Sequence, residues 1–143
     1  MKISSRFTIA VHTLLCILQF KDEKITSNFI SKSVNVNPVI IRNILIQLQR
    51  ADIITVKRGT GGISLNRKIE NINLLDIFDA VESLDDDKLF SFHNNPNKKC
   101  PVGSRINDLL EPKLDDVQNA MEKELKKTSL KDIYKKLKDG VYK

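Results

Sequence analysis

The chain has 143 residues, of which 41% are hydrophobic and 29% charged, which fits a globular domain with its own core and excludes a disordered chain. Its net charge of +6 is uneven: residues 1–67 hold ten Lys/Arg against three Asp/Glu, a net +7, and residues 68–143 hold fourteen against fifteen, a net −1. This asymmetry favours a polyanion-binding N-terminal part followed by a neutral part of a different kind.

The apolar run from Phe7 to Phe20 resembles a signal peptide only in outline. Thr8, His12 and Thr13 interrupt it, and a charged Lys-Asp-Glu sequence follows where a small-residue cleavage site would stand. The run is also too short and too polar for a membrane span. The two cysteines lie far apart, which indicates a reducing compartment rather than a disulfide scaffold. We therefore expect a cytoplasmic protein with no membrane partner.

The first predicted element is a helix capped by Ser4 or Ser5 and ending near Phe20. Its apolar residues cover more than one face, so we expect it to pack on several sides, with Cys16 as a small buried hydrophobe. A short second helix follows Thr26, which is its expected N-cap.

The segment 37–52, NPVIIRNILIQLQRAD, predicts a third helix that Asn37 can cap and that Pro38 can begin. Its opposite faces differ: one is rich in Asn, Gln and Arg, side chains that match phosphates and base edges, and the other is an apolar stripe of Ile41, Ile44, Leu45 and Leu48. With the second helix and the turn before Pro38, this forms a candidate helix-turn-helix and DNA-recognition helix. Any small helical domain can contain such a corner, so the pattern needs further support.

A predicted β-hairpin supplies that support. Residues 53–57 are strand-like, RGTGG at 58–62 is a turn, and residues 63–65 alternate as a returning strand. A hairpin directly after a helix-turn-helix is a wing, in which glycines allow close approach to DNA and an arginine can enter the minor groove. A nucleotide-phosphate loop is the competing interpretation, but no Gly-Lys-Ser/Thr opens a helix here.

The next segments are a helix capped by Asn73 and Asp76, ending near Ser83, and a polar loop over residues 84–99. The aspartates at 85–87 lack the other features of a metal site, so we interpret them as a solvated run and expect no metal.

A long helix is expected from about Val102 to Lys127, kinked or restarted at Pro112. The alternating four- and three-residue spacing of its apolar residues is typical of a coiled-coil seam and predicts a dimer interface of Leu110, Leu114, Val117, Met121 and Leu125. The alternative is packing on the first helix of the same chain. Ser129 and Asp132 should cap a last helix that packs back onto the body.

These segments together resemble the Rrf-two family of bacterial winged helix-turn-helix repressors over nearly the whole chain. The matching segments are MKISSRFTIAVHTL, ITSNFISKSVNVNPVIIRNILIQLQRADII, RGTGG, INLLDIFDAVE and CPVG…KTSLKDI, of which NPVIIRNI and CPVG are most similar to the YwnA-like branch. The expected fold is mainly α with a small β-hairpin wing. It comprises a winged helix-turn-helix DNA-binding domain (1–83), a loop bearing Cys100 (84–101), and a dimerisation helix with a C-terminal helix (102–143).

The resemblance implies a homodimer that binds a double-stranded DNA operator. By matching position it assigns Asn37, Val39, Ile40, Arg42 and Asn43 to the major groove, Lys57, Arg58 and Thr60 to the wing, and Ser4, Arg6 and Ser27 to phosphates. The wing departs from the family pattern: it is one residue shorter than is usual, and Ile63 stands where tyrosine is common.

Relatives that bind an iron–sulfur cluster carry three closely spaced cysteines after Glu82, whereas this chain has only Cys100 there. A cluster ordinarily takes four protein ligands, so we expect no such cofactor. Cys100 follows Lys98 and Lys99 near the expected helix start, and both features lower a thiol pKa. It is either a one-cysteine sensor of oxidants or electrophiles or a plain thiol. His93 lacks the further ligands of a metal site.

The leading hypothesis is a dimeric DNA-binding transcriptional repressor. A regulator that acts through a protein partner or an unidentified small-molecule ligand, without thiol chemistry, is the alternative. An enzyme is not expected, because the chain has no paired carboxylates, nucleophile–base motif or phosphate-binding loop.

Overall fold

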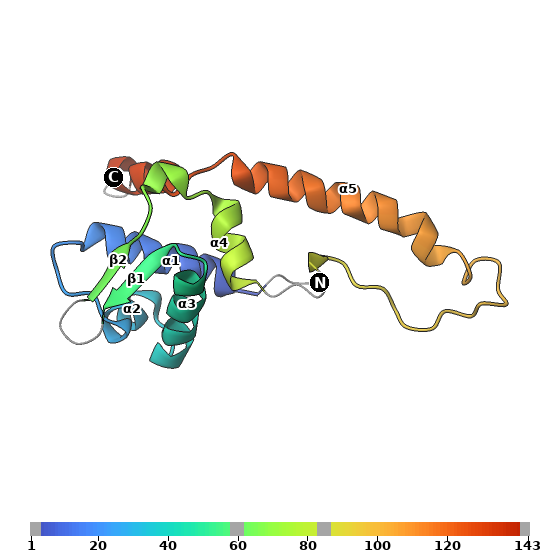
Figure 1. Cartoon of the computed structure of the whole chain (residues 1–143), viewed down its shortest axis with the longest axis horizontal. Helices are drawn as coiled ribbons and strands as arrows, with labels where there is room; N and C mark the ends of the chain where they lie inside the picture. Colours follow the sequence, from blue (N-terminus) through green and yellow to red (C-terminus); the bar gives the residue numbers. More distant parts are fainter. Residues whose placement is uncertain (1–3, 58–61, 83–86, 141–143) are drawn as a thin grey trace. The chain divides into compact units, whose positions relative to one another are not determined.

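The computed structural model describes residues 4–57, 62–82 and 87–140 (Figure 1). Within these residues, six helices and one hairpin confirm the expected mainly α fold. The elements are α1 (Arg6–Gln19), α2 (Ser27–Val34), α3 (Pro38–Arg50), β1 (Ile54–Lys57), β2 (Gly62–Leu65), the 3-10 turn η1 (Ile69–Asn71), α4 (Leu74–Val81), α5 (Ile106–Lys126) and α6 (Leu130–Gly140). They form two compact units: unit 1 contains residues 1–82 and 126–143, and unit 2 contains residues 83–125.

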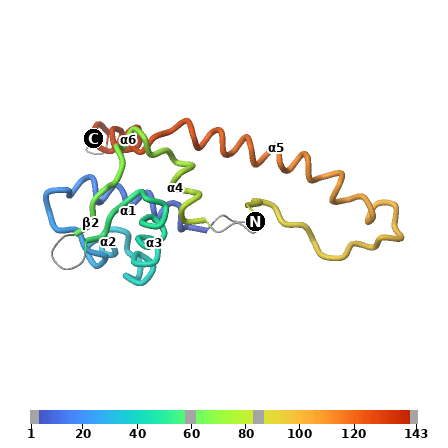
Figure 2. The backbone as a smooth tube through the Cα atoms, in the orientation of Figure 1, coloured from blue at the N-terminus to red at the C-terminus, as the bar shows by residue number. Residues whose placement is uncertain are grey.

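The core of unit 1 forms around α1, which packs against α2, α3, α4 and α6 (Figure 2). Ala10 and Leu14 are fully buried there. The predicted apolar stripe of α3 is confirmed, since none of its members is more than 6% exposed: Ile41, Ile44, Leu45 and Leu48. Burying such a side chain contributes roughly 1.5–3 kcal/mol, so this stripe fixes the orientation of α3 and leaves its opposite face to solvent.

Side-chain caps set the helix starts. Thr26 Oγ1 accepts from the N–H of Phe29 at 3.1 Å, and Asn73 with Asp76 forms a reciprocal capping box, as predicted. The start of α1 differs, because Ser5 occupies the N-cap position without a side-chain cap bond. Ser4 Oγ instead accepts from the N–H of Arg6 at 3.3 Å.

The C-terminal helix α6 packs against η1 and α1 within unit 1, in agreement with the prediction that it returns to the body. Ser129 and Asp132 exchange the two bonds of a capping box, at 2.9 and 3.1 Å. Leu130 is fully buried, and its N–H donates to the carbonyl of Ile72 at 2.7 Å. The start of α6 is thus bonded to the segment that joins the hairpin to α4.

The helix α5 begins at Ile106 rather than near Val102. It continues through Pro112, so of the two alternatives at that proline, a kink or a second start, the second start is wrong. Gln118 is its buried polar residue. Its side chain accepts from the N–H of Leu89 at 2.8 Å and donates to the carbonyl of Asp87 at 2.7 Å, which satisfies the buried amide. No helix in the three described ranges is long and apolar enough to cross a membrane.

Candidate nucleic-acid interface

The free face of α3 combines basic, amide and apolar side chains. Arg42 and Asn43 are exposed, as are three large apolar residues that have no place in the core: Val39 at 50%, Ile40 at 37% and Ile46 at 46%. Positions 39, 43 and 46 fall on one side of a helix because they are separated by about one turn. The sequence interpretation did not include Ile46, although this spacing identifies it.

Asn37, a predicted major-groove residue, also caps the helix α3. Its Oδ1 accepts from the N–H of Val39 at 2.8 Å, which caps α3. A bidentate contact to adenine uses both the oxygen and the nitrogen of an amide. The cap bond uses one of the two lone pairs of Oδ1 and holds the Asn37 side chain at the start of the helix, whereas Asn43 is exposed.

A groove of about 340 Å³ lies between the start of α2, the free face of α3 and the hairpin. It brings together three of the predicted DNA-binding residues, Ser27, Arg42 and Lys57, and adds Lys24 from the loop before α2. No acidic residue is among its lining side chains. A concave surface with three cations and no carboxylate attracts a polyanion such as a DNA backbone.

Ser4 and Arg6 are bonded within the chain and are not among the residues that line the groove. Ser4 Oγ donates to the carboxylate of Glu82 at 2.9 Å, and Arg6 Nε donates to the carbonyl of Val81 at 3.2 Å. The guanidinium of Arg6 also donates to the side chain of Gln47 on α3. Arg6 therefore joins α1, α3 and the end of α4, and a phosphate contact would have to share or replace these bonds.

The base of the hairpin is held against the end of α3. Lys57 is the last residue of β1 and pairs with Gly62 of β2, whose φ of +70° suits glycine. The predicted wing residues Arg58 and Thr60 lie outside the described residues. Arg67 donates to the carbonyl of Ala51 at 2.7 Å. The sequence analysis did not predict this hydrogen bond, because the local sequence pattern of an exposed arginine is the same as that of an arginine bonded to a helix end.

Cys100 lies in a turn before α5 rather than in its first turn, which corrects the expected position. The backbone N–H groups of Gly103 and Val102 lower the pKa of the Cys100 thiol. Gly103 is needed for this turn, because a Cβ there would stand 2.5 Å from the carbonyl oxygen of Asn97. The pKa shift has the expected direction, but backbone donors in a tight turn cause it, rather than lysines or a helix N-terminus.

The predicted seam on α5 is partly open in the single chain. Leu110 and Val117 are 42% and 41% exposed, and the remaining members are half-buried: Leu114, Met121 and Leu125. Leu109, which was not assigned to the seam, is 62% exposed. An exposed apolar row of this kind is typical of a surface that another chain covers.

The residues present do not fit an iron–sulfur cluster. Cys100 is the one cysteine of unit 2, and Cys16 is buried on α1 in unit 1. Within the described ranges, no group of three His, Cys, Asp or Glu side chains is placed to hold a metal ion. The sequence contains two cysteines, whereas an iron–sulfur cluster ordinarily takes four protein ligands.

A helix-turn-helix with an exposed mixed face on its second helix, a basic groove and an adjoining hairpin defines a winged helix-turn-helix DNA-binding protein. The model of the Rrf2 family, described as "Iron-dependent Transcriptional regulator", matches residues 3–136. The chain belongs to the Rrf2 (Rrf-two) family of transcriptional regulators, and it is not an enzyme.

Individual relatives agree with this assignment. The chain is 44% identical over 131 residues to the "Putative HTH-type transcriptional regulator YwnA" of Bacillus subtilis (strain 168). The aligned region covers 92% of this chain and 96% of that protein. It is similar to a crystal structure of a "putative DNA binding protein", with 40% identity, a TM-score of 0.74 and coverage of 90% and 98%. The cysteine regulator CymR of B. subtilis shares the fold, with a TM-score of 0.66, 18% identity and coverage of 94% and 97%.

Proposed function

We propose that the protein is a cytoplasmic, homodimeric repressor that binds a specific operator through α3 and its hairpin. The observation that carries the proposal is the groove in which Lys24, Arg42 and Lys57 converge beside the exposed face of α3. Three cations in a concavity suit the phosphate backbone, whereas the amide and apolar side chains of α3 suit base edges. The family membership and the name of the YwnA relative point the same way.

The residues divide into two roles. Arg42 and Lys57 face the groove and supply charge to phosphates, with Lys24 and Ser27 at its α2 side. Asn43, exposed on the first two turns of α3, is free to pair with a base. Loss of a phosphate contact lowers the affinity for all DNA sequences by a similar factor, whereas loss of a base-edge contact changes which sequence is preferred.

This division gives a direct test. Duplexes selected from a random library by the wild-type protein are compared with those selected by Asn43→Ala and Lys57→Ala. We expect Asn43→Ala to change the selected sequence, and Lys57→Ala to keep it while lowering affinity and the salt dependence of binding. A uniform loss for both variants would show that Asn43 does not read bases. Salt-insensitive binding by the wild-type chain would refute the whole assignment.

The α5 row supports the dimer. Leu110 and Val117 expose apolar surface one heptad apart, the spacing at which two helices pack along a seam. Val117→Glu should shift the protein toward monomer in sedimentation velocity. Val102→Glu, at a 64% exposed valine outside the row, is the matched control and should leave the dimer intact. Equal sedimentation of the two variants would refute the interface.

Cys100 is the proposed sensor because the N–H groups of Gly103 and Val102 favour its thiolate, the form that reacts with peroxides and electrophiles. Peroxide oxidises this thiolate to a sulfenic acid and is itself reduced to water. Operator affinity is therefore measured before and after peroxide in wild type and Cys100→Ser. We expect a loss in wild type only, and an equal response of both proteins would overturn the sensor role.

A further inference from the structure

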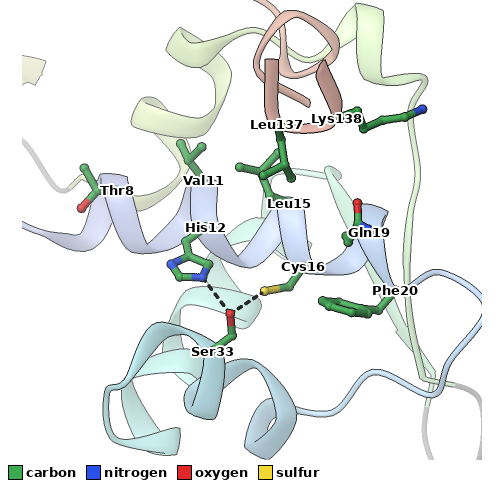
Figure 3. A pocket seen from close by; sticks show the side chains of 10 residues that line it. All are labelled: Thr8, Val11, His12, Leu15, Cys16, Gln19, Phe20, Ser33, Leu137 and Lys138. Atoms are coloured by element: carbon green, nitrogen blue, oxygen red, sulfur yellow. Dashed lines mark hydrogen bonds between the residues drawn. The ribbon is translucent and has the colours of Figure 1, made fainter. Parts of the chain in front are cut away.

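A pocket of about 750 Å³ lies along α1 in unit 1 and shares no lining residue with the basic groove (Figure 3). Its apolar wall is formed by Val11 and Leu15 of α1, Phe20 at the end of that helix, and Leu137 of α6. Val11 and Leu15 are only half-buried, although the opposite face of α1 is completely buried in the core. The second apolar face of α1, which the sequence places inside the protein, thus opens on a cavity.

One corner of this pocket is polar. Ser33 Oγ on α2 lies 2.9 Å from Nε2 of His12 and 3.4 Å from Sγ of Cys16, whose thiol donates to it. Figure 3 shows His12 and Cys16 pointing from α1 toward Ser33, whereas Lys138 points away from this corner. The Nζ of Lys138 is 5.1 Å from the ring centroid of Tyr134, so that cation belongs to the rim.

The polar corner offers a hydrogen-bond donor in either tautomer of His12. If Nε2 accepts from the Ser33 hydroxyl, the ring proton is on Nδ1 and can be donated to a ligand. If Nε2 carries the proton and donates, the Ser33 hydroxyl proton is available instead. The complementary ligand group is therefore an acceptor such as a carboxylate, sulfonate or carbonyl oxygen.

Size and charge define the rest of the ligand. The volume lies within the range of pockets that hold small organic molecules, and apolar walls with a few convergent polar groups are typical of such sites. No Asp or Glu is among the lining residues, and residues 1–67 carry a net +7. An anionic ligand is favoured over a cationic one.

We propose that this pocket is an effector site for a small organic anion with an apolar body, such as an aromatic or medium-chain carboxylate. The body packs on Val11, Leu15 and Leu137, and the head group binds at His12 and Ser33. The occupant contacts α1 and α2, two of the helices that pack against the recognition helix α3. Its binding is therefore coupled to DNA affinity, a step that rests on the proposed function.

The thiol of Cys16 provides a reporter that is specific for the pocket. In Cys100→Ser protein, Cys16 is the one remaining cysteine, and its alkylation by N-ethylmaleimide is followed by intact mass. The probe ligand is 1-anilinonaphthalene-8-sulfonate, an apolar anion whose fluorescence reports binding. We expect the probe to slow alkylation in a saturable way, with the same midpoint as its fluorescence titration. Binding without protection of Cys16 would overturn the site.

Matched variants separate the pocket from the general surface. Ser33→Ala removes the shared hydroxyl and should weaken the probe about tenfold, since a hydrogen bond to a charged group is lost, whereas Ser64→Ala at an exposed serine of β2 should not. Leu137→Glu should abolish binding, and Lys135→Gln, which makes the same charge change elsewhere on α6, should not. Equal effects within either pair would refute the proposal.

Two further measurements decide the occupant and the coupling. If alkylation of Cys16 slows as protein concentration rises without probe, a second copy covers the pocket, and the small-molecule proposal is wrong. The affinity for duplex DNA is then compared with and without saturating probe, and an unchanged affinity would overturn the coupling. Probe binding is measured without DNA, and DNA binding without probe, so failure of this site is distinguished from failure of the proposed function.

Discussion

Uracil substitution in the operator tests whether the apolar residues of α3 read bases, because it removes the thymine methyl and leaves base pairing intact. Val39 and Ile40 occupy the first turn of α3 and expose 50% and 37% of their surface. In the major groove the thymine methyl is the apolar feature that such side chains can contact. Removing a buried group of that size costs about 0.8 kcal/mol, or about fourfold in affinity for each contacted thymine.

The assay uses duplexes selected by the wild-type protein from a thymine library, remade with deoxyuridine. We expect wild type to bind the uracil duplex about fourfold more weakly for each contacted methyl. Val39→Ala with Ile40→Ala should bind the two duplexes with nearly the same affinity, and Val102→Ala should behave as wild type. Equal wild-type affinity for both duplexes, or full discrimination by the double variant, would refute the reasoning while leaving phosphate binding untouched.

Three further predictions concern residues whose partners are defined. Asn37→Ala should lower the free energy of unfolding by about 1 kcal/mol in a urea titration, since the cap on the Val39 N–H is lost, whereas Asn37→Ser should retain most of it. Gln118→Ala should speed hydrogen exchange at Leu89, whose N–H donates to that side chain, with little change in unit 1; unchanged exchange would show that the bond is not formed. In Cys16→Ser protein, alkylation of Cys100 should reach half its plateau at a lower pH in the folded chain than in denaturant, because the folded state lowers the thiol pKa; coincident pH profiles would contradict this.

Local signals predicted the first helices of unit 1 well. The stripe of α3 and the caps at Thr26 and Asn73 are confirmed because periodicity and capping act over a few residues of chain. The start of α5 was placed too early, since Pro101 and Gly103 allow a tight turn that the sequence does not distinguish from a first helical turn. Backbone N–H groups of that turn also lower the pKa of the Cys100 thiol, an effect that the sequence analysis attributed to the neighbouring lysines and a helix N-terminus.

The candidate site could be predicted as a set of residue types but not as a surface. Arg6 and Arg42 are both arginines assigned to DNA, yet Arg6 donates to Gln47, 41 residues away, whereas Arg42 lines the basic groove. Which of the two arginines lines the groove depends on the packing of α1 against α3. Such long-range contacts produce no periodic pattern in the sequence from which they could be predicted. Cys16 was similarly predicted as buried, which it is at 5% exposure, and it belongs to the core cluster. The sequence did not show that its thiol also contacts Ser33 at the edge of a pocket.

Side-chain hydrogen bonds anchor the base of the hairpin to the end of α3. Arg67 binds the carbonyls of Ala51 and Asp52 at the end of α3, and Asn66 binds the carbonyl of Ile54 and the carboxylate of Asp52. Asp52 itself adopts a φ of +61°, so the chain turns sharply from α3 into β1. These bonds fix the strand that carries Lys57 relative to the helix that carries Arg42. On the proposed function, the two sides of the groove are therefore ordered before DNA binds, and phosphate binding does not have to supply the free energy of ordering them.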